Sequence, residues 1–317
     1  MERMFFIVNP AAGCERCGKI FEEKVEPILK EKKADYGFVM TEYPFHAIKL
    51  TEEALKNGEK FIVAVGGDGT INEVSSVLCG KQGIKFGILP FGTGNDIADT
   101  LKLPLTPDEA LDVLFNESAQ NMDMGAVNDK KFINIAGIGF DVDVLINVAK
   151  RKAKAKSKAK GMLPYFMGIL DALFHRRRIH AVIETENEKI EEDILLTTIG
   201  NGRRFGGGMK ATPKAIVNDG LFDICVVQYI SLANFLYLLP FFMKGKHIGK
   251  KPVRYFRARS MKIITDVKCK MELDGEIFEG TPAQFNIIPN ALRIVCPRIE
   301  NDGKTLSGEN VTIPEAC

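Results

Sequence analysis

The sequence predicts a two-domain protein, in which an α/β domain with a parallel sheet precedes a mostly antiparallel β domain. Residues 1–115 alternate short apolar runs with stretches of helical periodicity. Strand–helix alternation of this kind implies a parallel α/β sheet. From about residue 120, short runs separated by turn signals dominate, which favours antiparallel strands. The length of 317 residues also favours two domains over one.

Four apolar runs in the first part are expected to be the strands of the parallel sheet. They lack in/out alternation, as parallel strands covered on both faces do. The runs are Phe5–Val8, Gly37–Met40, Phe61–Val65 and Phe86–Leu89. After them, the Thr-Pro-Asp-Glu segment Thr106–Glu109 is typical of a capping box and predicts a helix that runs to about Phe115.

Turn signals organise the second part. They stand at Asn128-Asp129, Asn187-Glu188, Asn218–Gly220 and Asp274-Gly275. Between them we expect short antiparallel strands, with helical insertions near residues 142–175 and 231–245. The expected division is an α/β domain at residues 1–127, a β domain at residues 128–300 and a polar tail at residues 301–317.

The longest uncharged run, Ile224–Met243, has about the length of a membrane span. Polar residues and Pro240 interrupt it, and its first half is rich in β-branched residues. We therefore interpret it as a strand, Ile224–Ile230, followed by a helix that Ser231 caps.

The composition is that of an ordinary globular protein, with 45% hydrophobic and 26% charged residues. A formal net charge of +2 excludes a nucleic-acid binder that acts through its overall charge, so any basic function needs a local patch. Seven cysteines at irregular spacing and the lack of a secretory signal predict reduced thiols and a cytoplasmic protein.

Three glycine-rich loops follow strands of the first domain. They are Asn9–Gly13 (NPAAG), Gly66–Thr70 (GGDGT) and Pro90–Asp96 (PFGTGND). The carboxyl ends of parallel strands line the ligand crevice of an open sheet, and glycines there let backbone N–H groups approach phosphate oxygens. One such turn is more often structural than functional. Three at one sheet edge predict a phosphate site.

Asp68 lies in the middle of this site. A carboxylate among phosphate-binding amides would repel the ligand, unless a divalent cation lies between them or the carboxylate handles the proton of an attacking group. Short polar side chains that can contact phosphate or metal-bound water surround it, namely Thr70, Asn72 and Thr93, together with Glu73.

Two other local patterns are interpreted as incidental. Gly13–Lys19 has the spacing of a Walker A loop, but Ile20 follows instead of the Ser or Thr that would bind magnesium. Cys14 and Cys17 form a lone C-x-x-C, and no second pair has the spacing of zinc ligands.

Taken together, these motifs resemble the bacterial diacylglycerol kinase family of soluble lipid kinases. The wider superfamily includes sphingosine, ceramide and NAD kinases and phosphofructokinases. The resemblance covers roughly residues 4–297 and continues through Asn201-Gly202, Phe205–Met209, Asn218–Gly220 and Leu273–Glu276. It implies a nucleotide-binding α/β catalytic domain of the NAD-kinase/diacylglycerol-kinase type, a C-terminal β-sandwich that binds the lipid, and catalysis with ATP and Mg²⁺ in the cleft between them.

The resemblance also assigns residues. ATP would be held by Asn9, Pro10, Ala11, Ala12 and Gly13, by Thr41, by Gly67, Asp68, Gly69, Thr70, Ile71, Asn72 and Glu73, and by Thr93. The acids around the catalytic magnesium would be Asp68, Asp123 and Asp274. Either Asp274 or Glu276 would accept the proton of the lipid hydroxyl, and Glu276 matches the base of the family better. A structural magnesium would bind Asp219 and the backbone carbonyls of Ile216 and Leu221.

Without the resemblance, several of these residues have plainer interpretations. Asp274-Gly275 and Asn218–Gly220 are ordinary turn signals, and Asp123 is an acid at a strand edge. A functional role is favoured because the first domain already offers many N–H groups that can bind phosphate, and carboxylates from a second domain are needed to complete such a site.

A basic segment, Lys150–Lys160, carries seven positive charges and no acid, and apolar residues and Arg176–Arg178 follow it. Basic and apolar clusters in tandem suit an anionic bilayer surface. A solvated loop before a core helix is an equal alternative. Aromatic residues do not alternate with the lysines and no nucleic-acid motif is present, so we expect no nucleic-acid partner.

The sequence thus predicts an ATP-dependent lipid kinase that associates reversibly with the membrane surface. Diacylglycerol, which would give phosphatidic acid, leads among its acceptors, while phosphatidylglycerol, a sphingoid base and a polyprenol stay open. An NAD kinase-like enzyme and a catalytically silent nucleotide or lipid sensor are the alternatives. The basic–apolar segment and Leu273–Glu276 argue against the first, and the joint presence of Asp68, Asp274 and Glu276 argues against the second. The oligomeric state stays open, a homodimer included.

Overall fold

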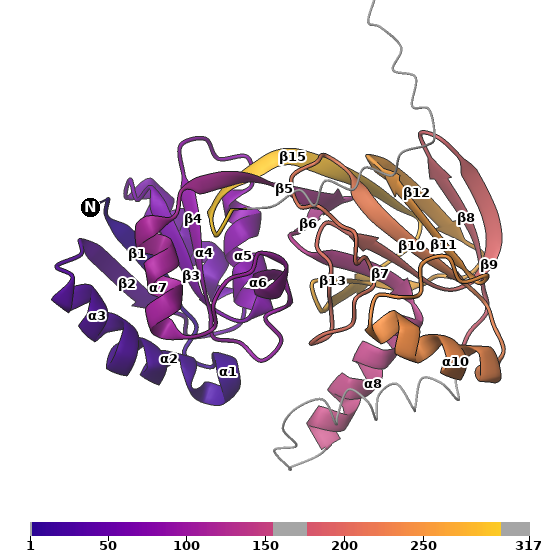
Figure 1. Ribbon diagram of the computed structural model, residues 1–317, viewed down its shortest axis with the longest axis horizontal. Helices are drawn as coiled ribbons and strands as arrows, with labels where there is room; N and C mark the ends of the chain where they lie inside the picture. The colour runs from indigo at the N-terminus through magenta and orange to yellow at the C-terminus, as the bar shows by residue number, and fades with distance from the viewer. Residues whose placement is uncertain (1, 155–175, 299–317) are drawn as a thin grey trace, which may run out of the picture.

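A computed structural model describes residues 2–154 and 176–298 of the chain. The protein has two lobes, an α/β lobe at the N-terminus and a β-rich lobe after it, and two long strands run between them (Figure 1). The predicted fold class is confirmed.

The N-terminal lobe contains a parallel sheet in the order β4-β3-β1-β2. Its strands are β1 (Met4–Val8), β2 (Tyr36–Met40), β3 (Phe61–Gly66) and β4 (Lys85–Pro90), so all four expected strands are present. Its helices are α1 (Ala12–Glu15), α2 (Cys17–Ile20), the π-helical turn η1 (Phe21–Val25), α3 (Glu26–Glu31), α4 (His46–Lys56), α5 (Asp68–Leu78), α6 (Asp96–Thr100) and α7 (Pro107–Asn116).

Helices cover both faces of this sheet, which explains the continuous apolar runs. The central strand β3 is buried along its whole length. Helices α4 and α5 pack together on one face, and α7 packs with η1 on the other (Figure 1). At the start of α7, Pro107 takes the first helical position as predicted. The Thr106 hydroxyl, however, donates to Glu109 Oε2 (2.7 Å) and does not cap a backbone N–H group.

The C-terminal lobe consists of antiparallel strands around two apolar cores. The strands are β5 (Ala119–Val127), β6 (Lys130–Phe132), β7 (Ile135–Gly139), β8 (Ile179–Thr185), β9 (Lys189–Gly200), β10 (Phe222–Gln228), β11 (Val253–Ala258), β12 (Ser260–Thr265), β13 (Lys270–Leu273), β14 (Glu276–Glu279) and β15 (Ala283–Val295). Hairpins form at three predicted turns: Asn128-Asp129, the loop at Asn187-Glu188, and Asp274-Gly275.

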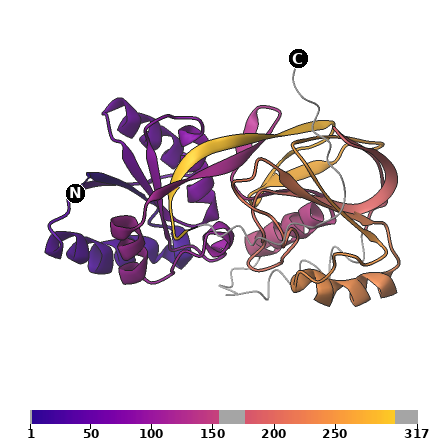
Figure 2. The ribbon, with the colours of Figure 1, turned by 45° about the horizontal axis from the view of Figure 1, so that its top comes forward.

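Strands β5 and β15 connect the lobes. β15 pairs with β12 near its start, follows β5 along most of its length, and pairs in parallel with β4 at Ile294 and Phe86 (Figures 1 and 2). The sequence-based division assigned residues 128–300 to the second domain. The structure adds that Ala291–Cys296 packs in the core of the first lobe.

The uncharged run at 224–243 forms strand β10 and helix α10 (Leu232–Met243). The hydroxyl oxygen of Ser231 accepts a hydrogen bond from the Asn234 N–H (3.3 Å), so the predicted cap is present. No helix in the described part of the chain is long and apolar enough to cross a bilayer. The other predicted insertion begins as α8 (Phe140–Lys154), whereas most of the basic segment and residues 162–174 lie outside the described residues.

Candidate active site

The three glycine-rich loops meet at the carboxyl edge of the parallel sheet. The Asn9 side chain donates to Thr70 Oγ1 (2.9 Å), which joins the first loop to the start of α5. The second and third loops touch at two glycines, because a Cβ atom added to Gly92 would lie 2.3 Å from Gly67 Cα. Side chains larger than hydrogen are therefore excluded at this contact.

The first and third loops are also in contact. Gly13 has a φ of +59°, and a Cβ atom there would lie 2.4 Å from the Phe91 carbonyl oxygen. Thr41 directly follows β2 at the same sheet edge, and its N–H donates to the Val8 carbonyl (2.8 Å). Thr93 is exposed. The predicted nucleotide-binding segments thus share one edge of the sheet.

Asp68 is the first residue of α5 and lies against the third loop. Its Oδ1 faces the Ile97 N–H at 3.4 Å, and a Cβ atom on Gly94 would lie 2.8 Å from its Oδ2. Burial raises the pKa of Asp68, and backbone N–H groups of residues 95–97 oppose this rise. The start of α5 also exposes N–H groups that favour an anion.

Two further carboxylates, Asp96 and Asp274, gather with Asp68 where the lobes meet. Burial raises the pKa of Asp96 to about 6, and the negative charge of Asp68 contributes to the rise. Burial likewise raises the pKa of Asp274 to about 7, again with a contribution from Asp68. These three side chains are called the interlobe acids below.

Two of the interlobe acids, Asp274 and Asp96, accept hydrogen bonds from backbone groups of the C-terminal lobe. Asp274 accepts hydrogen bonds from the consecutive N–H groups of Ile133 (2.8 Å), Asn134 (3.0 Å) and Ile135 (2.9 Å). Asp96 Oδ2 accepts from the Gly207 N–H (2.9 Å). Sequence reasoning missed Asp96 as a site residue, although it ends the Pro90–Asp96 motif.

The interlobe acids suit magnesium in their chemistry. Carboxylate oxygens are its preferred protein ligands, and a cation would relieve their mutual repulsion. No group of three or more His, Cys, Asp or Glu side chains in the described part of the chain is close enough to enclose a metal ion. This is compatible with magnesium, which usually keeps several waters and binds one or two carboxylates plus substrate phosphates.

Glu276 begins β14 directly after the Asp274-Gly275 turn and faces the N-terminal lobe. A groove of about 950 Å³ contains Glu276 and Lys130 on one side and Asn72 and Glu73 on the other. Burial raises the pKa of Glu276, while the charge of Lys130 opposes this rise. Burial and the charge of Glu276 together raise the pKa of Glu73, whose Oε2 accepts from the Ala47 N–H (3.1 Å).

Asp123 is buried and both of its carboxylate oxygens accept backbone hydrogen bonds. Oδ2 accepts from the Gly220 N–H (2.7 Å) and Oδ1 from the Asn290 N–H (2.8 Å). These bonds tie β5 to the 218–220 turn and to a bend in β15. Within the described residues, Asp123 makes no hydrogen bond to Asp68 or Asp274.

The turn predicted to hold a structural magnesium contains an ion pair. Asp219 pairs with Arg257, and its Oδ1 also accepts from the Leu221 N–H (3.1 Å). Arg257 thus already supplies positive charge next to this carboxylate. The magnesium site at Ile216, Asp219 and Leu221 stays a prediction.

A buried pair of acids, Asp141 and Glu272, was not foreseen. A Cβ atom on Gly137 would lie 1.7 Å from Asp141 Oδ2 and 3.1 Å from Glu272 Oε1, so both oxygens face the same point. Both lack a hydrogen-bond partner among the described residues. Burial raises the pKa of Asp141 to about 7 and that of Glu272 well above its usual range. We expect two carboxyl groups that face each other in this way to share a proton.

Asp141 also borders a narrow apolar cavity between the sheet, α8 and α10. The other side chains around it are nonpolar and include Phe140, Val144, Leu195, Phe205, Leu238 and Phe242. Glu272 in turn lies two residues before Asp274. The acid pair therefore lies between the interlobe acids and an apolar cavity.

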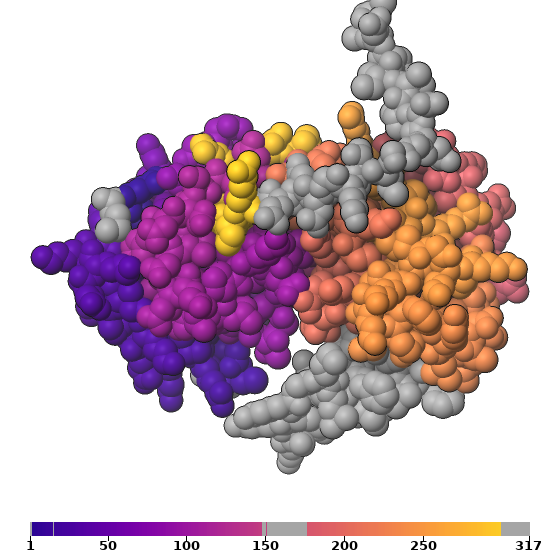
Figure 3. Space-filling model, in the orientation of Figure 1, coloured from indigo at the N-terminus to yellow at the C-terminus, as the bar shows by residue number. Residues whose placement is uncertain are grey.

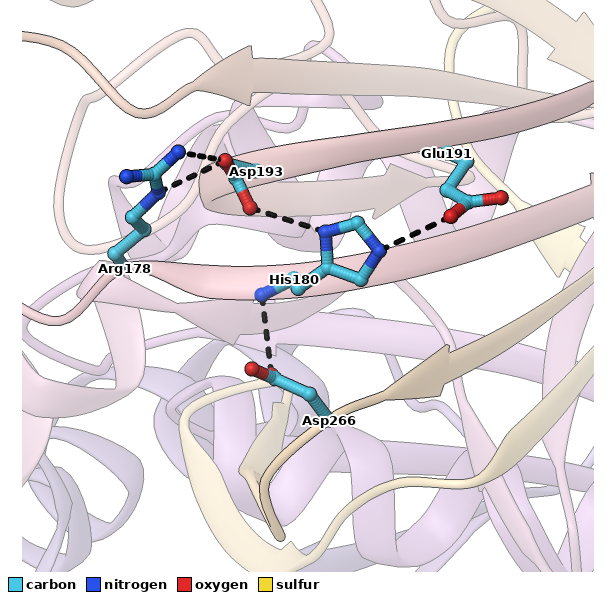
Figure 4. Close-up of polar contacts among 5 residues, drawn as sticks. All are labelled: Arg178, His180, Glu191, Asp193 and Asp266. Carbon is cyan, nitrogen blue, oxygen red and sulfur yellow. Dashed lines mark hydrogen bonds and ion pairs between the residues drawn. The ribbon is translucent and has the colours of Figure 1, made fainter.

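A second polar cluster lies away from this site, on β8 and β9 (Figure 4). His180 Nδ1 lies 3.0 Å from Asp193 Oδ1, and its Nε2 lies 3.3 Å from Glu191 Oε1. Arg178 pairs with the same Asp193. The six cysteines in the described ranges are free; Cys14 is exposed and Cys17 is buried.

Comparison with protein families divides the chain in two. Residues 3–127 match the diacylglycerol kinase catalytic domain. Residues 136–296 match the YegS C-terminal NAD kinase β-sandwich-like domain. The boundary between these matches lies at the end of β5.

Curated relatives match over most of their length. The chain is 30% identical over 303 residues to a diacylglycerol kinase of Bacillus subtilis, which covers 94% of this chain and 97% of that protein. It is 30% identical over 302 residues to a diacylglycerol kinase of Mycobacterium tuberculosis, covering 92% and 94%. With a protein of Alcanivorax borkumensis named "Probable lipid kinase YegS-like" the identity is 33% over 260 residues, covering 79% of this chain and 83% of that protein.

Among solved structures, the crystal structure of a diacylglycerol kinase from Bacillus anthracis superposes with a TM-score of 0.70 at 21% identity. It covers 93% of this chain and 97% of that one, which shows that the fold is shared. The family matches and the curated relatives identify the kind of protein: the chain belongs to the bacterial diacylglycerol kinase family, a family of lipid kinases.

Proposed function

We propose that this lipid kinase transfers the γ-phosphoryl group of ATP to the hydroxyl of a membrane lipid, with diacylglycerol as the leading acceptor. The gathering of Asp68, Asp96 and Asp274 beside the glycine-rich loops is the observation that carries the proposal. This arrangement places the backbone N–H groups of the N-terminal lobe, which would bind phosphate, next to carboxylates from both lobes, which would bind the metal. Curated relatives named diacylglycerol kinase support this choice of acceptor.

Phosphoryl transfer depends mainly on positioning and on the neutralisation of charge. The triphosphate would lie against the glycine-rich loops and the N-terminus of α5, where N–H groups can approach its oxygens. Asp68, Asp96 and Asp274 would hold magnesium and its waters. When bound, magnesium would neutralise the charge that develops on the transferred group.

Glu276 is the better candidate for the base. The carboxylate of Asp274 already accepts three backbone hydrogen bonds, whereas Glu276 lies in the interlobe groove with a raised pKa. A raised pKa brings a carboxylate closer to the working pH, which improves general base catalysis. Glu276 would take the hydroxyl proton while the lipid oxygen bonds to the γ-phosphorus and ADP leaves.

The apolar cavity beside Asp141 supports a lipid acceptor over a soluble dinucleotide. Its lining is almost entirely nonpolar, and it lies in the C-terminal lobe close to the acids Asp141 and Glu272. The cavity has a volume of about 40 Å³, which is room for only a few methylene groups, and the part of an acyl chain that enters it gains free energy by leaving water. A dinucleotide would bring charged phosphates and polar sugars instead.

The test is a transfer assay with γ-labelled ATP and purified protein. Diacylglycerol, phosphatidylglycerol, a sphingoid base and a polyprenol are offered in mixed micelles, and NAD is offered in solution. We expect magnesium-dependent label in phosphatidic acid. Label on NAD alone would favour an NAD kinase, and ATP binding without transfer to any acceptor would favour a sensor.

A further inference from the structure

Helix α10 is apolar on both of its faces. Its inner face buries Phe235, Leu238 and Phe242 against the C-terminal lobe. Its outer face presents Leu232, Ala233, Leu236, Tyr237, Pro240 and Met243, called the α10 outer face below. The polar side-chain groups of this helix are the amide of Asn234, which is exposed as well, and the hydroxyl of Tyr237. A helix that packs on the surface of a domain normally has a polar outer face.

The exposure on this face is large. Tyr237 is 61% exposed and Leu236 is 51% exposed. In both ribbon views α10 lies on the outside of the C-terminal lobe, and its atoms (orange) reach the surface in the space-filling view (Figures 1–3). A contiguous exposed apolar face of this kind marks an interaction site.

Basic residues border the α10 outer face. Lys244, Lys246, Lys250 and Lys251 follow the helix, and the sequence from Ile224 to Thr265 contains eight Lys and Arg residues and no Asp or Glu. Lys250 Nζ lies 4.2 Å from the centre of the Phe241 ring. Within the described residues, no salt bridge pairs any of these four lysines with a carboxylate.

A basic side chain, Arg176, also lies near the N-terminal end of α10. Arg176 donates to the carbonyl oxygen of Ile230 (3.2 Å), and its guanidinium lies 6.0 Å from the ring centre of the exposed Tyr229. Aromatic and basic side chains thus flank the apolar face at both ends. Side chains with an apolar body and a polar tip are suited to the boundary between lipid and water.

The charge pattern distinguishes between two kinds of partner. A second copy bound through the same face by two-fold symmetry would bring these lysines toward their own counterparts, and like charges would repel. An anionic bilayer offers apolar chains for the helix and negative headgroups for the lysines. We propose that the α10 outer face docks on anionic membrane surfaces.

This inference deepens the proposed function and rests on it for its purpose. Leu238 and Phe242, on the inner face of α10, line the apolar cavity proposed for the acyl chain. Docking through the outer face would therefore bring that cavity to the bilayer. An acyl chain could then pass from the bilayer to the cavity with little exposure to water.

The test is cosedimentation with phosphatidylcholine vesicles that contain or lack phosphatidylglycerol, without ATP or diacylglycerol. The Leu236→Ser/Tyr237→Ser double variant is compared with Leu105→Ser, which removes an exposed leucine (59%) from the other lobe. We expect the α10 variant to bind roughly tenfold more weakly, from the apolar area it loses, and the control to bind as wild type. Lys250→Gln/Lys251→Gln should lose roughly tenfold as well, and high salt should remove the difference. The basic segment 150–160 is present in every variant, so the comparison isolates α10.

The outcomes separate docking from catalysis. Unchanged vesicle binding by the α10 variants would overturn the docking proposal, whatever the kinase activity. A shift of these variants from dimer to monomer in sedimentation velocity, with vesicle binding unchanged, would also overturn it in favour of a second copy. Roughly tenfold weaker vesicle binding together with full activity on detergent-dispersed diacylglycerol is the expected result. If the protein binds vesicles through α10 but phosphorylates no lipid, the proposed function is wrong and the docking proposal stands.

Discussion

The carboxylate of Asp96 accepts a hydrogen bond from the Gly207 N–H at 2.9 Å, and this bond joins the two lobes at the candidate active site. Asp96 ends the third glycine-rich loop, and Gly207 lies in the Phe205–Met209 loop of the other lobe. The carboxylate of Asp96 therefore has two candidate roles. It forms a hydrogen bond between the lobes, and its negative charge would help to bind magnesium.

Asp96→Asn separates these two roles, because asparagine keeps an oxygen that can accept from Gly207 and removes the charge. If the charge matters, turnover falls by about 10²-fold or more, while gel filtration and circular dichroism stay those of the wild type. Wild-type turnover in Asp96→Asn would mean that Asp96 only forms the interlobe hydrogen bond and that its charge is not needed for catalysis.

The Asp96→Asn variant should be more stable than the wild type at neutral pH, although its turnover falls. Burial raises the pKa of Asp96 to about 6, above that of the unfolded chain. The stabilisation from its proton is therefore complete below the unfolded-state pKa and is lost as the pH rises through about 6. At neutral pH and without magnesium, the variant should be more stable by about 3 kcal/mol in urea unfolding. A less stable variant would contradict the raised pKa.

Asp68 and Glu276 should differ in how much activity they carry. Asp68→Ala is expected to abolish turnover with the fold intact, because both magnesium and nucleotide would be misplaced. Glu276→Gln should cost only about 10²–10⁴-fold, the usual contribution of a general base. Single-turnover assays and ATP titrations measure both effects. Near-normal activity of Asp68→Ala would refute its assignment.

Local patterns were sufficient for the N-terminal lobe. The apolar runs located β1–β4, and parallel strands place their carboxyl ends at one edge, so the three loops could be brought together without a structure. The return of β15 could not be found in this way. Ile294 pairs with Phe86, which is remote in the sequence, and such a pairing leaves no local pattern.

The buried acids show a different limit of sequence reasoning. In β13, alternation would turn Glu272 outward between Met271 and Leu273, yet all three are buried. Helix α8 and the neighbouring strands cover this face, which only the tertiary structure reveals. Asp123 shows the converse. The sequence offers only an acid at a strand edge, whereas in the structure its oxygens accept hydrogen bonds from the backbone N–H groups of Gly220 and Asn290, and its place in the magnesium network stays a prediction.

The Gly67–Gly92 contact predicts a position-specific effect on stability. A Cβ atom on Gly92 would lie 2.3 Å from Gly67 Cα, so Gly92→Ala should lower the free energy of unfolding by about 1–3 kcal/mol. Gly69→Ala is the matched control, because a Cβ atom there meets nothing within 4 Å. Thermal unfolding of both variants decides the point. If Gly92→Ala is as stable as Gly69→Ala, the two loops can move apart without loss of stability.

The His180 cluster predicts a measurable titration. Hydrogen bonds to Asp193 and Glu191 raise the pKa of His180 (Figure 4). Its stabilising charge is therefore fully present below the unfolded-state pKa and is lost as the pH rises through the folded-state value. His180→Gln should lower Tm more below pH ~6 than above pH ~8. NMR titration of Asp193→Asn should show a lower pKa for His180; an unchanged pKa would mean that this contact is absent in solution.

The acid pair Asp141 and Glu272 predicts that the protein loses stability in mild alkali. Burial raises both pKa values, that of Asp141 to about 7, so the shared proton stabilises the folded protein. This stabilisation is complete below the unfolded-state pKa values and is lost as the pH rises through about 7.

Glu272→Gln is the sharpest test of this pair. An amide can donate a hydrogen bond to Asp141 at any pH, so the fall in Tm between pH ~6 and ~9 should be smaller than in the wild type. Glu22→Gln serves as the control, because it removes an exposed carboxylate that lies outside the pair and outside the His180 cluster, and it should leave the alkaline fall unchanged. If Glu272→Gln shows the same alkaline fall as the wild type, the two carboxyl groups do not share a proton, and the alkaline sensitivity originates elsewhere in the chain.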